Sequence, residues 1–247
     1  MIEVKNLVKK YGNHLAVDHL NFTIEEGHIY GFLGPNGAGK STTMNIMTGY
    51  LSATSGTVRI AGHEMLLEPE EAKRHIGYLP EIPPVYPDMT PREYLRFAGE
   101  LKGVARGKLE AEVERVMELT GITSMHRRLI GNLSKGYRQR VGVSCALLGD
   151  PEVIILDEPT SHLDFGNQFR FIQLVEKLQA LGIGVLMTTH FPDHALYLGC
   201  DTVILDKGEI IASGNARDVI NDENMSRIYR IDAHIVEIDG REICVPF

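Results

Sequence analysis

The feature that most constrains this chain is a glycine-rich loop, GPNGAGKST, at residues 34–42. It matches the pattern G-x-x-x-x-G-K-[ST], in which backbone N–H groups wrap around phosphate oxygens. A short apolar run at residues 29–33 precedes the loop, and a helical pattern at residues 40–48 follows it. Strand, loop and helix in this order are the context that the pattern requires. The sequence therefore predicts a phosphate-binding loop in an α/β fold with a mainly parallel sheet.

The side chains of this loop supply what a bound nucleotide needs. The ammonium group of Lys40 reaches the β- and γ-phosphates, and the hydroxyl group of Ser41 is a ligand for Mg²⁺. A glycine-rich turn that merely caps a helix is the alternative, and the flanking strand and helix argue against it. We expect nucleotide contacts from the loop residues Asn36, Gly37, Ala38, Gly39, Lys40, Ser41 and Thr42.

A pair of acids follows the most apolar run of the chain. Residues 153–156 read VIIL, which is the length of a buried strand, and Asp157 and Glu158 come next. A phosphate loop needs a carboxylate that holds the metal at the end of a neighbouring strand. Asp157 is predicted to position Mg²⁺ and its water shell, and Glu158 to polarise the attacking water as general base. The alternative is an ordinary strand that ends in surface acids.

A second helix start carries an exposed serine and an exposed glycine. In LSKGYRQR, residues 133–140, Ser134 is a suitable N-cap and Gly136 allows close approach of backbone. Such a helix start is a second site for phosphate, unless it is a plain capped helix. A separate lobe of one chain cannot bring this segment over its own phosphate loop. Two chains in a head-to-tail dimer are therefore implied.

The middle of the chain has a different character. Five prolines between residues 80 and 91 exclude a helix or a central strand there. Helical patterns follow at residues 91–102, which begin with a proline, and at residues 108–120. These patterns predict a separate helical lobe between about residues 80 and 145.

The last third returns to alternating strands and helices. A crossover helix is predicted at residues 169–181, followed by a buried parallel strand at residues 184–188. Two hairpins are expected near the end, formed by strands 203–205 with 209–212 and 235–238 with 242–245. The second hairpin turns at Asp239 and Gly240, a pair that tolerates the left-handed conformation and suits a type I′ turn.

Composition excludes several classes of protein. The net charge of -8 argues against a large basic face for nucleic acid, because phosphate binding needs clustered Lys and Arg. No run approaches the roughly 20 consecutive apolar residues that a membrane span requires, and nothing at the start of the sequence marks it for secretion. Three widely spaced cysteines are interpreted as free thiols. We expect a soluble cytoplasmic protein.

The order of the motifs along the chain is specific. The phosphate loop, LSKGYRQR, the VIIL strand with its two acids, SHLD at residues 161–164 and TTH at residues 188–190 resemble the ATP-binding subunits of ABC transporters. The resemblance covers nearly the whole chain. It implies an ATPase with ATP and Mg²⁺ as cofactors and a RecA-like P-loop core. An antiparallel β subdomain and an inserted helical subdomain would accompany this core.

The resemblance also assigns roles to single residues. The resemblance implies that the ring of Tyr11 stacks on adenine. It also implies that Ser134 and Gly136 contact the γ-phosphate held by the opposite subunit. Asp164 communicates across the dimer, and His190 holds the γ-phosphate and the attacking water. His190 follows the second acid of the VIIL strand by 32 residues, which suits the next strand. The simpler alternatives are a turn-packing aromatic for Tyr11 and a satisfied strand-end histidine for His190.

An organisation and a set of partners follow from the same resemblance. Residues 1–247 would form a single ABC ATPase domain with a core and β subdomain, a helical subdomain and a β-hairpin tail, at residues 1–79 with 146–225, 80–145 and 226–247, respectively. The chain would dimerise on MgATP and drive a membrane permease. It would lie at the cytoplasmic face of the membrane and be soluble when expressed alone. No nucleic-acid partner is expected.

Two departures from the family pattern stand out. Glu81 lies where the family usually has Gln, and it could ligate Mg²⁺ directly or through water. The family signature LSGGQ is here LSKGY, with Lys135 and Tyr137 at two of its positions. Because the serine and the second glycine survive, sandwiching of ATP between two chains should survive too.

The two parts of the chain resemble different branches of the family. Residues 1 to about 157 are similar to the ATPases of small-permease exporters, and residues from about 158 to 247 to those of iron-siderophore and cobalamin importers. A hybrid chain and an outlying subfamily with both sets of traits are the two explanations. In the family the permease docks around the segment at residues 81–103. Four side chains there are expected either to meet it or to pack the lobe's own core: Tyr86, Met89, Tyr94 and Phe97.

Two other functions share the phosphate loop. A soluble ABC ATPase of DNA repair or translation usually carries long coiled-coil insertions or two fused ATPase units, and neither pattern occurs in this sequence. A small-molecule kinase needs an acceptor pocket, and the LSKGY segment and the acid pair argue against it. His190 and His194, four residues apart, have a spacing that also allows a shared metal.

Overall fold

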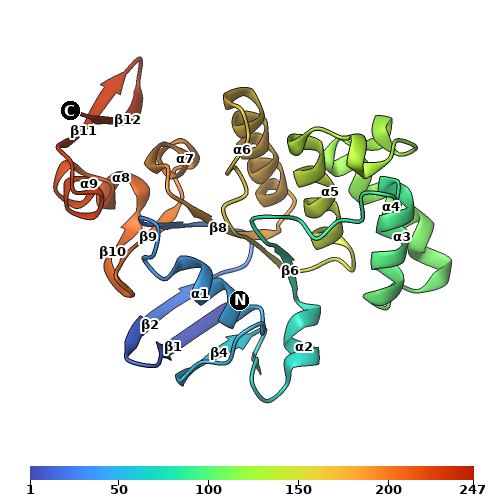
Figure 1. Ribbon diagram of the computed structural model, residues 1–247, viewed down its shortest axis with the longest axis horizontal. Helices are drawn as coiled ribbons and strands as arrows, with labels where there is room; N and C mark the ends of the chain where they lie inside the picture. The colour runs from blue at the N-terminus through green and yellow to red at the C-terminus, as the bar shows by residue number, and fades with distance from the viewer.

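A six-stranded sheet forms the centre of the computed structural model, which describes residues 1–247 (Figure 1). Its strands are, in spatial order, β10 (Glu209–Asn215), β9 (Asp201–Asp206), β3 (Ile29–Leu33), β8 (Gly184–Thr189), β7 (Val153–Leu156) and β6 (Ile76–Leu79). The neighbours from β9 to β6 run parallel, and β10 pairs antiparallel with β9. The predicted α/β fold with a mainly parallel sheet is confirmed.

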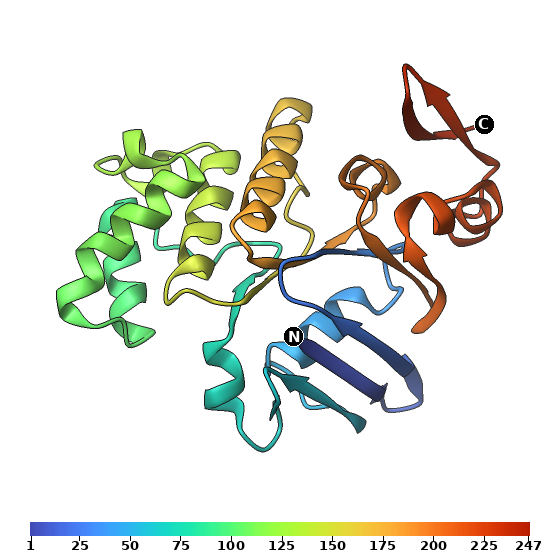
Figure 2. The ribbon, with the colours of Figure 1, turned by 180° about the vertical axis from the view of Figure 1, so that it is seen from behind.

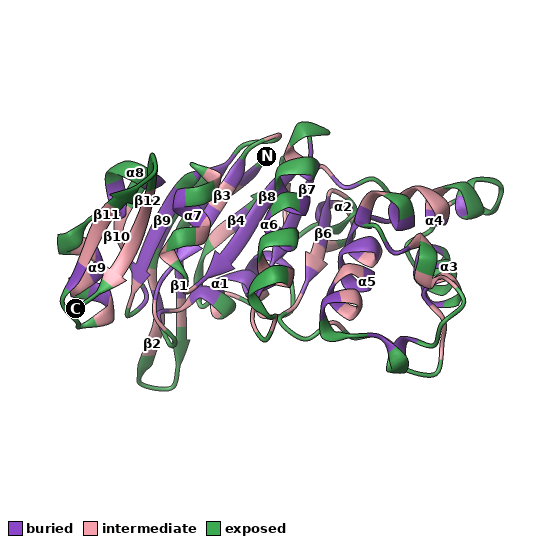
Figure 3. Ribbon diagram, turned by 90° about the horizontal axis from the view of Figure 1, so that it is seen from above, coloured by how far each residue is buried: buried purple, intermediate pink, exposed green.

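Hydrophobic residues on both faces explain why β7 and β8 lie inside the sheet. Every residue of these two strands is buried, and Figure 3 shows them as an unbroken buried band. Parallel strands are covered on both faces, so they read as continuous apolar runs. The strand predicted at residues 153–156 is confirmed with the same bounds. The strand predicted at residues 184–188 extends one residue further, to Thr189.

The register of the parallel strands brings their carboxyl ends to one edge of the sheet. Leu33, at the end of β3, pairs with Thr189, at the end of β8. Leu156, at the end of β7, pairs with Met187 of β8 and with Leu79 of β6. The segments that follow these four strands therefore emerge side by side. The acid-bearing strand was expected to neighbour the phosphate-loop strand, which is wrong by one place: β8 pairs with both and lies between them.

A second, antiparallel sheet packs against α1 (Lys40–Met47), the helix that follows the phosphate loop (Figures 1 and 2). Its strands are, in order, β2 (His14–Ile24), β1 (Ile2–Tyr11), β4 (Ser55–Ile60) and β5 (His63–Glu64). Inward-facing residues of β1, such as Ile2 and Leu7, share one buried cluster with Met44 and Met47 of α1. This sheet is the antiparallel β subdomain that the family resemblance implies.

Between β6 and β7 the chain leaves the sheet and forms a group of helices at one end of the molecule (Figure 1). These are α3 (Pro91–Leu101), α4 (Arg106–Thr120) and α5 (Lys135–Leu147), with 3-10 turns at Thr123–Met125 and Ile130–Asn132. A capping box starts α3: the hydroxyl of Thr90 accepts from the Glu93 N–H at 3.3 Å, and the Glu93 carboxylate accepts from the Thr90 N–H at 2.8 Å. The two predicted helices are confirmed within two residues.

Lys102 joins the end of α3 to the end of α5. Its Nζ donates to the carbonyl oxygens of Cys145, Ala146 and Leu148, at 2.9, 3.0 and 3.0 Å. These carbonyls lie at the C-terminus of α5, where the helix dipole favours a cation. One ammonium group therefore holds the two helices together at this end.

The four side chains expected around the docking segment divide into two pairs. Tyr86 and Phe97 are exposed, at 50% and 38%. Tyr94 is buried, and its hydroxyl donates to the carbonyl oxygen of Pro84 at 3.3 Å. Met89 is half-buried and packs against the main core. The second alternative, packing of the lobe's own core, therefore holds for Tyr94 and Met89.

Gly77→Ala is expected to destabilise the protein. Gly77 lies in β6, and a Cβ there would be 2.3 Å from the carbonyl oxygen of Ala146 in α5. Because a backbone contact is not relieved by a side-chain rotation, we expect a loss of about 1–3 kcal/mol in the free energy of unfolding, measured by urea titration. Gly107→Ala in α4 is the control, since its methyl group would meet open space. An equal loss in both variants would contradict the packing argument.

The crossover helix α6 (Phe165–Ala180) begins four residues before its predicted start at residue 169. The reason is Asp164, whose carboxylate accepts from the Asn167 N–H at 2.8 Å and caps the helix. Four short helices were not predicted from the sequence: α2 (Pro69–Arg74), α7 (Pro192–Leu198), α8 (Ala216–Val219) and α9 (Asp222–Tyr229).

The chain ends in a two-stranded sheet of its own, formed by β11 (Ala233–Ile238) and β12 (Arg241–Pro246). It lies at the opposite end of the molecule from α3 and α4 (Figures 1 and 2). Asp239 and Gly240 have φ of 50° and 75°, which confirms the predicted type I′ turn. The predicted strands of both hairpins fall within the observed ones. The three cysteines are free, as predicted.

Candidate nucleotide site

The phosphate loop enters α1 through a left-handed glycine. Gly39, the residue before the helix, has φ of 102°, and a Cβ there would be 2.6 Å from the carbonyl oxygen of Ala16. Only glycine tolerates both this positive φ and this close approach of another backbone. No side chain caps the start of α1. Its first N–H groups are therefore available to an anion, and the helix dipole favours negative charge there.

The side chain of Lys40 lies within this loop and is only 5% exposed. Its Nζ donates to the carbonyl oxygens of Gly34 and Pro35, at 2.7 and 3.3 Å. It also lies 3.2 Å from Oε1 of Glu158. This is a charge contact without hydrogen-bond geometry, since that oxygen has no hydrogen-bond partner. The cation expected to neutralise phosphate is thus held beside the predicted base.

Asp157 is buried directly after β7 and is bound by hydroxyl groups from two other elements. Its Oδ1 accepts from Ser41 Oγ at 3.3 Å and from Thr188 Oγ1 at 2.8 Å. Burial raises the pKa of the Asp157 carboxyl, and the two hydroxyl donors act in the opposite direction. The hydroxyl of Thr188 also accepts from the Glu158 N–H at 2.7 Å. Thr188 thus orients both acids, a role that its place in the TTH motif did not reveal.

Glu158 and His190 form one hydrogen-bonded unit. Oε2 of Glu158 lies 2.8 Å from Nδ1 of His190, and it accepts from Ser161 Oγ at 3.5 Å. Glu158 has φ of 44°, a strained conformation for a residue with a Cβ. Such strain concentrates at functional sites. The carboxylate fixes the orientation of the imidazole, an arrangement of base and partner typical of active sites.

Lys40, Ser41, Glu158 and His190 line one pocket of about 540 Å³ at the carboxyl edge of the central sheet, whereas Asp157 is not part of the lining and reaches it only through its hydrogen bond with Ser41. Its walls contain the following residues predicted from the sequence: Tyr11, Asn36, Gly37, Ala38, Gly39, Lys40, Ser41, Thr42, Glu81, Glu158 and His190. Four further lining residues were missed: His14, Ala16, Ser161 and His162. Two of them belong to the SHLD motif, which was a usable signal. The other two reach the loop only through the antiparallel sheet, and nothing local in the sequence indicates that.

Tyr11 and Glu81 line the same pocket from different elements. Tyr11 ends β1 and is 46% exposed, with Lys9 Nζ 5.2 Å from the centre of its ring. A ring this exposed can stack on a base, whereas an aromatic that packs a turn would be covered. Oε1 of Glu81 lies 3.4 Å from Nε2 of His162. The carboxylate that replaces the usual amide therefore lies beside a histidine.

Ser134, Gly136 and Asp164 are not among the residues that line this pocket. Ser134 caps α5 by accepting from the Tyr137 N–H at 3.4 Å. A Cβ on Gly136 would lie 3.0 Å from the side-chain amide carbon of Asn167. The amide nitrogen of Asn167 donates to the Asp164 carboxylate at 2.7 Å. The three residues thus form a second group, where α5 and α6 begin.

The hydroxyl of Ser41 and the carboxylate of Asp157 fit a magnesium ion, which prefers oxygen ligands. No group of three or more His, Cys, Asp or Glu side chains that could hold a metal is present. His190 and His194 therefore gather no further ligand, and Nδ1 of His194 lies 3.2 Å from the Thr189 hydroxyl. Mg²⁺ is usually held by one or two carboxylates and by substrate phosphates. The oxygens present suit an ion that arrives with a nucleotide.

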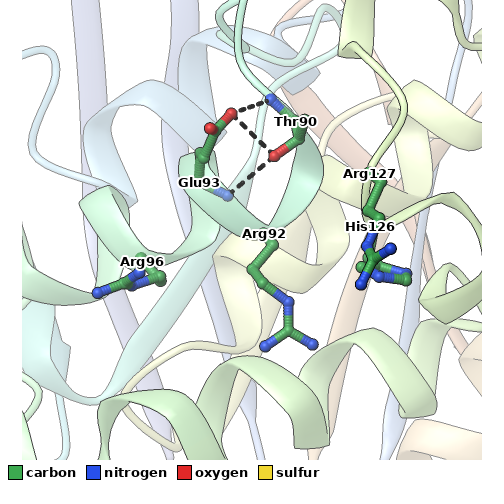
Figure 4. Close-up of a pocket in the computed structure, with 6 residues that line it drawn as sticks. All are labelled: Thr90, Arg92, Glu93, Arg96, His126 and Arg127. Carbon is green, nitrogen blue, oxygen red and sulfur yellow. Dashed lines mark hydrogen bonds between the residues drawn. The ribbon is translucent and has the colours of Figure 1, made fainter.

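Another hollow, of about 440 Å³, lies on the helical lobe (Figure 4). Arginines dominate its lining. Arg92 forms ion pairs with Glu110 and Glu114, and Arg96 Nε lies 2.7 Å from the Glu110 carboxylate. Arg92 and Arg96 are thus already paired with acids, which leaves Arg127 as the one arginine of the lining without an ion pair. We assign no site to it.

A phosphate loop after β3, a buried acid pair after β7 and a histidine after β8 define a P-loop nucleotide-binding protein. Residues 17–161 match the family described as ABC transporter. The chain belongs to this family, in its group of ATP-binding proteins.

Similar proteins also indicate that the chain belongs to this family. The chain is 37% identical over 221 residues to the probable multidrug ABC transporter ATP-binding protein YbhF of Escherichia coli, an alignment that covers 89% of this chain and 38% of YbhF. It is 34% identical to the linearmycin resistance ATP-binding protein LnrL of Bacillus subtilis, over 89% of this chain and 70% of LnrL. The chain thus spans well under half the length of YbhF.

A third relative bears on the two-part resemblance. The Nod factor export ATP-binding protein I of Cupriavidus metallidurans is 31% identical over 243 residues, which is 98% of this chain and 78% of that protein. This likeness to an export ATPase therefore continues past residue 157. It reaches the part of the chain that resembles importer ATPases.

Solved structures match the fold closely. CbiO1 of Clostridium perfringens, part of the ABC transporter complex cbiONQ, has a TM-score of 0.81 at 25% identity, with 92% of each chain covered. The cassette MJ0796, a dimer in a post-hydrolysis state bound to ADP and Pi, has a TM-score of 0.77 at 26% identity, with 88% of this chain and 99% of that chain covered. The RecA-like P-loop fold with its two subdomains is thereby confirmed.

Proposed function

We propose that this chain is the ATP-binding and ATP-hydrolysing subunit of an ABC transporter, and that it works as a head-to-tail dimer around two MgATP. One observation carries the proposal: Lys40, Asp157, Glu158 and His190 converge where three adjacent parallel strands end. Family membership supports it. So do the names of the relatives and the ADP and Pi in the MJ0796 dimer.

Each residue around the pocket has a chemical task in this proposal. The loop N–H groups and Lys40 bind the β- and γ-phosphates. Ser41 and Asp157 would hold Mg²⁺, which neutralises negative charge on the phosphates when it is bound. Glu158 accepts the proton of the attacking water, and His190, oriented by Glu158, donates to the γ-phosphate. Phosphoryl transfer depends chiefly on such positioning and electrostatics.

The dimer follows from the separation of the two groups of residues. Ser134 and Gly136 lie at the start of α5, outside the pocket that the phosphate loop forms. A serine hydroxyl and free N–H groups at a helix start suit phosphate. In a head-to-tail dimer they would close over the γ-phosphate bound by the partner. The side chain of Asn167 lies against Gly136 and donates a hydrogen bond to Asp164, so Asp164 would then lie near the interface as well.

We place the chain at the cytoplasmic face of a membrane, bound to permease subunits. No helix is long and apolar enough to cross a membrane. The docking surface we propose is the segment at residues 81–103, where Tyr86 and Phe97 are exposed and in contact, with ring centres 5.9 Å apart. Aromatic side chains of this kind are enriched at protein interfaces.

Partner choice tests this function. Co-expression with an exporter-type permease should give a complex and a stimulated ATPase, because the docking segment belongs to the exporter-like part of the chain and specificity needs contacts at the interface. A siderophore-type permease should give neither. Pull-down and phosphate release are the measurements. Tyr86→Ala and Phe97→Ala should weaken the complex about tenfold or more, as interface aromatics do.

The control is Tyr50→Ala, since Tyr50 is an exposed tyrosine outside this segment. It should leave the complex intact. Stimulation by the siderophore-type permease alone would overturn the docking assignment. Binding to neither permease, with ATP hydrolysis intact, would remove the permease from the proposal and leave the ATPase.

A further inference from the structure

The backbone at the pocket histidine is held by a residue close to the end of the chain. Tyr229 is the last residue of α9, and its hydroxyl donates to the carbonyl oxygen of His190 at 2.9 Å. A phenol is protonated at neutral pH, and burial raises the pKa of the Tyr229 phenol further, so this hydroxyl is a donor. Met225 and Ile228, on the same helix, are buried in the main core. The donor is thus fixed to the body of the protein.

The hairpin after α9 holds the same loop a few residues further on. The backbone N–H of Cys244 in β12 donates to Oδ1 of Asp193 at 2.8 Å. Asp193 is the second residue of α7, three positions after His190. Residues 190–193, which run from the end of β8 into the first turn of α7, are therefore bound twice by residues 222–247. One bond attaches the C-terminal segment to the loop that carries the pocket histidine, and the other attaches it to the helix that follows this loop.

Few other contacts determine where this histidine lies. Its Nδ1 meets Glu158, and β8, whose pairing would fix the backbone, ends one residue earlier at Thr189. The Phe191 N–H donates back to the Thr189 hydroxyl at 3.0 Å, which closes a tight turn around position 190. The carbonyl of His190 is therefore a second point, besides the Glu158 carboxylate, at which the rest of the protein sets the position of the ring relative to a bound phosphate.

We propose that Tyr229 is a positioning residue for ATP hydrolysis, and that the C-terminal segment, residues 222–247, acts as a clamp on the histidine loop. The proposal rests on the role proposed above for His190. In it, the tyrosine does not touch substrate. It restricts the His190 backbone, so that the imidazole is already in place when the γ-phosphate arrives. Preorganised groups of this kind act on the rate rather than on binding.

Tyr229→Phe removes the hydroxyl and keeps the ring, so it separates the hydrogen bond from packing. We expect kcat to fall about fivefold, which corresponds to about 1 kcal/mol for a neutral hydrogen bond. KM for ATP should stay unchanged. Tyr197→Phe is the matched control: Tyr197 lies on α7, and no hydrogen bond from its hydroxyl to protein is present. It should keep wild-type kcat.

The hydrogen bond between Cys244 and Asp193 is tested by a separate pair of variants. Asp193→Ala removes the acceptor for the Cys244 N–H and should lower kcat about twofold to fivefold, while Asp193→Asn keeps an acceptor oxygen and should restore most of it. Phosphate release from the full-length chain is measured at saturating MgATP, together with Tm. A fall in ATP affinity and in kcat by the same factor would indicate general damage and would overturn positioning.

A double-mutant cycle separates this proposal from the function on which it rests. His190→Ala should reduce turnover severely, and Tyr229→Phe should cause no further loss in that background, measured with radiolabelled ATP. If His190→Ala hydrolyses at the wild-type rate, the role of His190 is wrong. If His190→Ala is inactive but Tyr229→Phe matches Tyr197→Phe, the role of His190 stands and the clamp is wrong.

Discussion

Glu158→Gln is expected to bind MgATP as the wild type does and to lose nearly all turnover. The amide keeps the size of the side chain and an acceptor oxygen for the His190 ring, so the pocket keeps its shape. It cannot take a proton from water, and loss of a general base costs roughly 100-fold to 10,000-fold. Because hydrolysis no longer opens the dimer, an ATP-dependent dimer should accumulate and be visible by size-exclusion chromatography.

Two controls accompany this variant. Glu152→Gln changes an acid that pairs with His75 outside the pocket, and it should hydrolyse normally. Chelation of divalent metal with EDTA should stop hydrolysis by the wild type, since the Ser41 and Asp157 oxygens are proposed to hold Mg²⁺. Hydrolysis by Glu158→Gln at the wild-type rate would remove this residue from the mechanism.

Lys40→Ala and Ser134→Arg are expected to fail at different steps. Lys40 lies in the phosphate loop, so its loss should weaken ATP binding by a single chain, by roughly tenfold to 100-fold for one charge-assisted contact. Ser134 lies outside the pocket, at the start of α5. The arginine should leave binding by the monomer intact, as measured by calorimetry, but fill the space over the partner's phosphate. Dimer closure and hydrolysis should then be lost.

Ser134→Ala serves as a milder version of the same change. It removes the cap of α5 without adding bulk, so it should cost stability but leave dimer closure partly intact. One comparison between these variants tests the head-to-tail dimer directly. If Ser134→Arg reduced ATP affinity in the monomer as much as Lys40→Ala does, the segment would belong to the pocket of its own chain, and the head-to-tail dimer would be wrong.

The parts of the fold that the sequence predicts well are those with a local cause. The strand at residues 153–156 is apolar throughout and has the predicted bounds, and the loop around Gly39 can only be made by glycine. The turn at Asp239 and Gly240 likewise depends on which residues tolerate positive φ. In each case the residues themselves restrict the backbone, so no distant contact is needed to recognise the structure.

The parts of the fold and of the site that could not be predicted from the sequence depend on contacts between distant segments. Strand order is one, since nothing in the sequence of β8 tells that it lies between β3 and β7. The role of Thr188 is another, because its hydroxyl meets Asp157 only after both strands pair. The early start of α6 depends on a single cap at Asp164, and α7, α8 and α9 are too short to show a clear period. His14 reaches the pocket only through the second sheet.

The hydrogen bonds from Lys102 connect the end of α3, which carries part of the proposed docking surface, to the end of α5. The exposed Phe97 lies on α3, and the ammonium group of Lys102 attaches the end of that helix to the last carbonyls of α5. Ser134 lies at the far end of α5, roughly 20 Å away for a helix of 13 residues. In the proposed dimer, a displacement of the aromatic surface would therefore be transmitted along α5 to the serine that is proposed to close over the partner's nucleotide. If the chain binds a permease as proposed, these hydrogen bonds would couple the docking surface to closure over ATP.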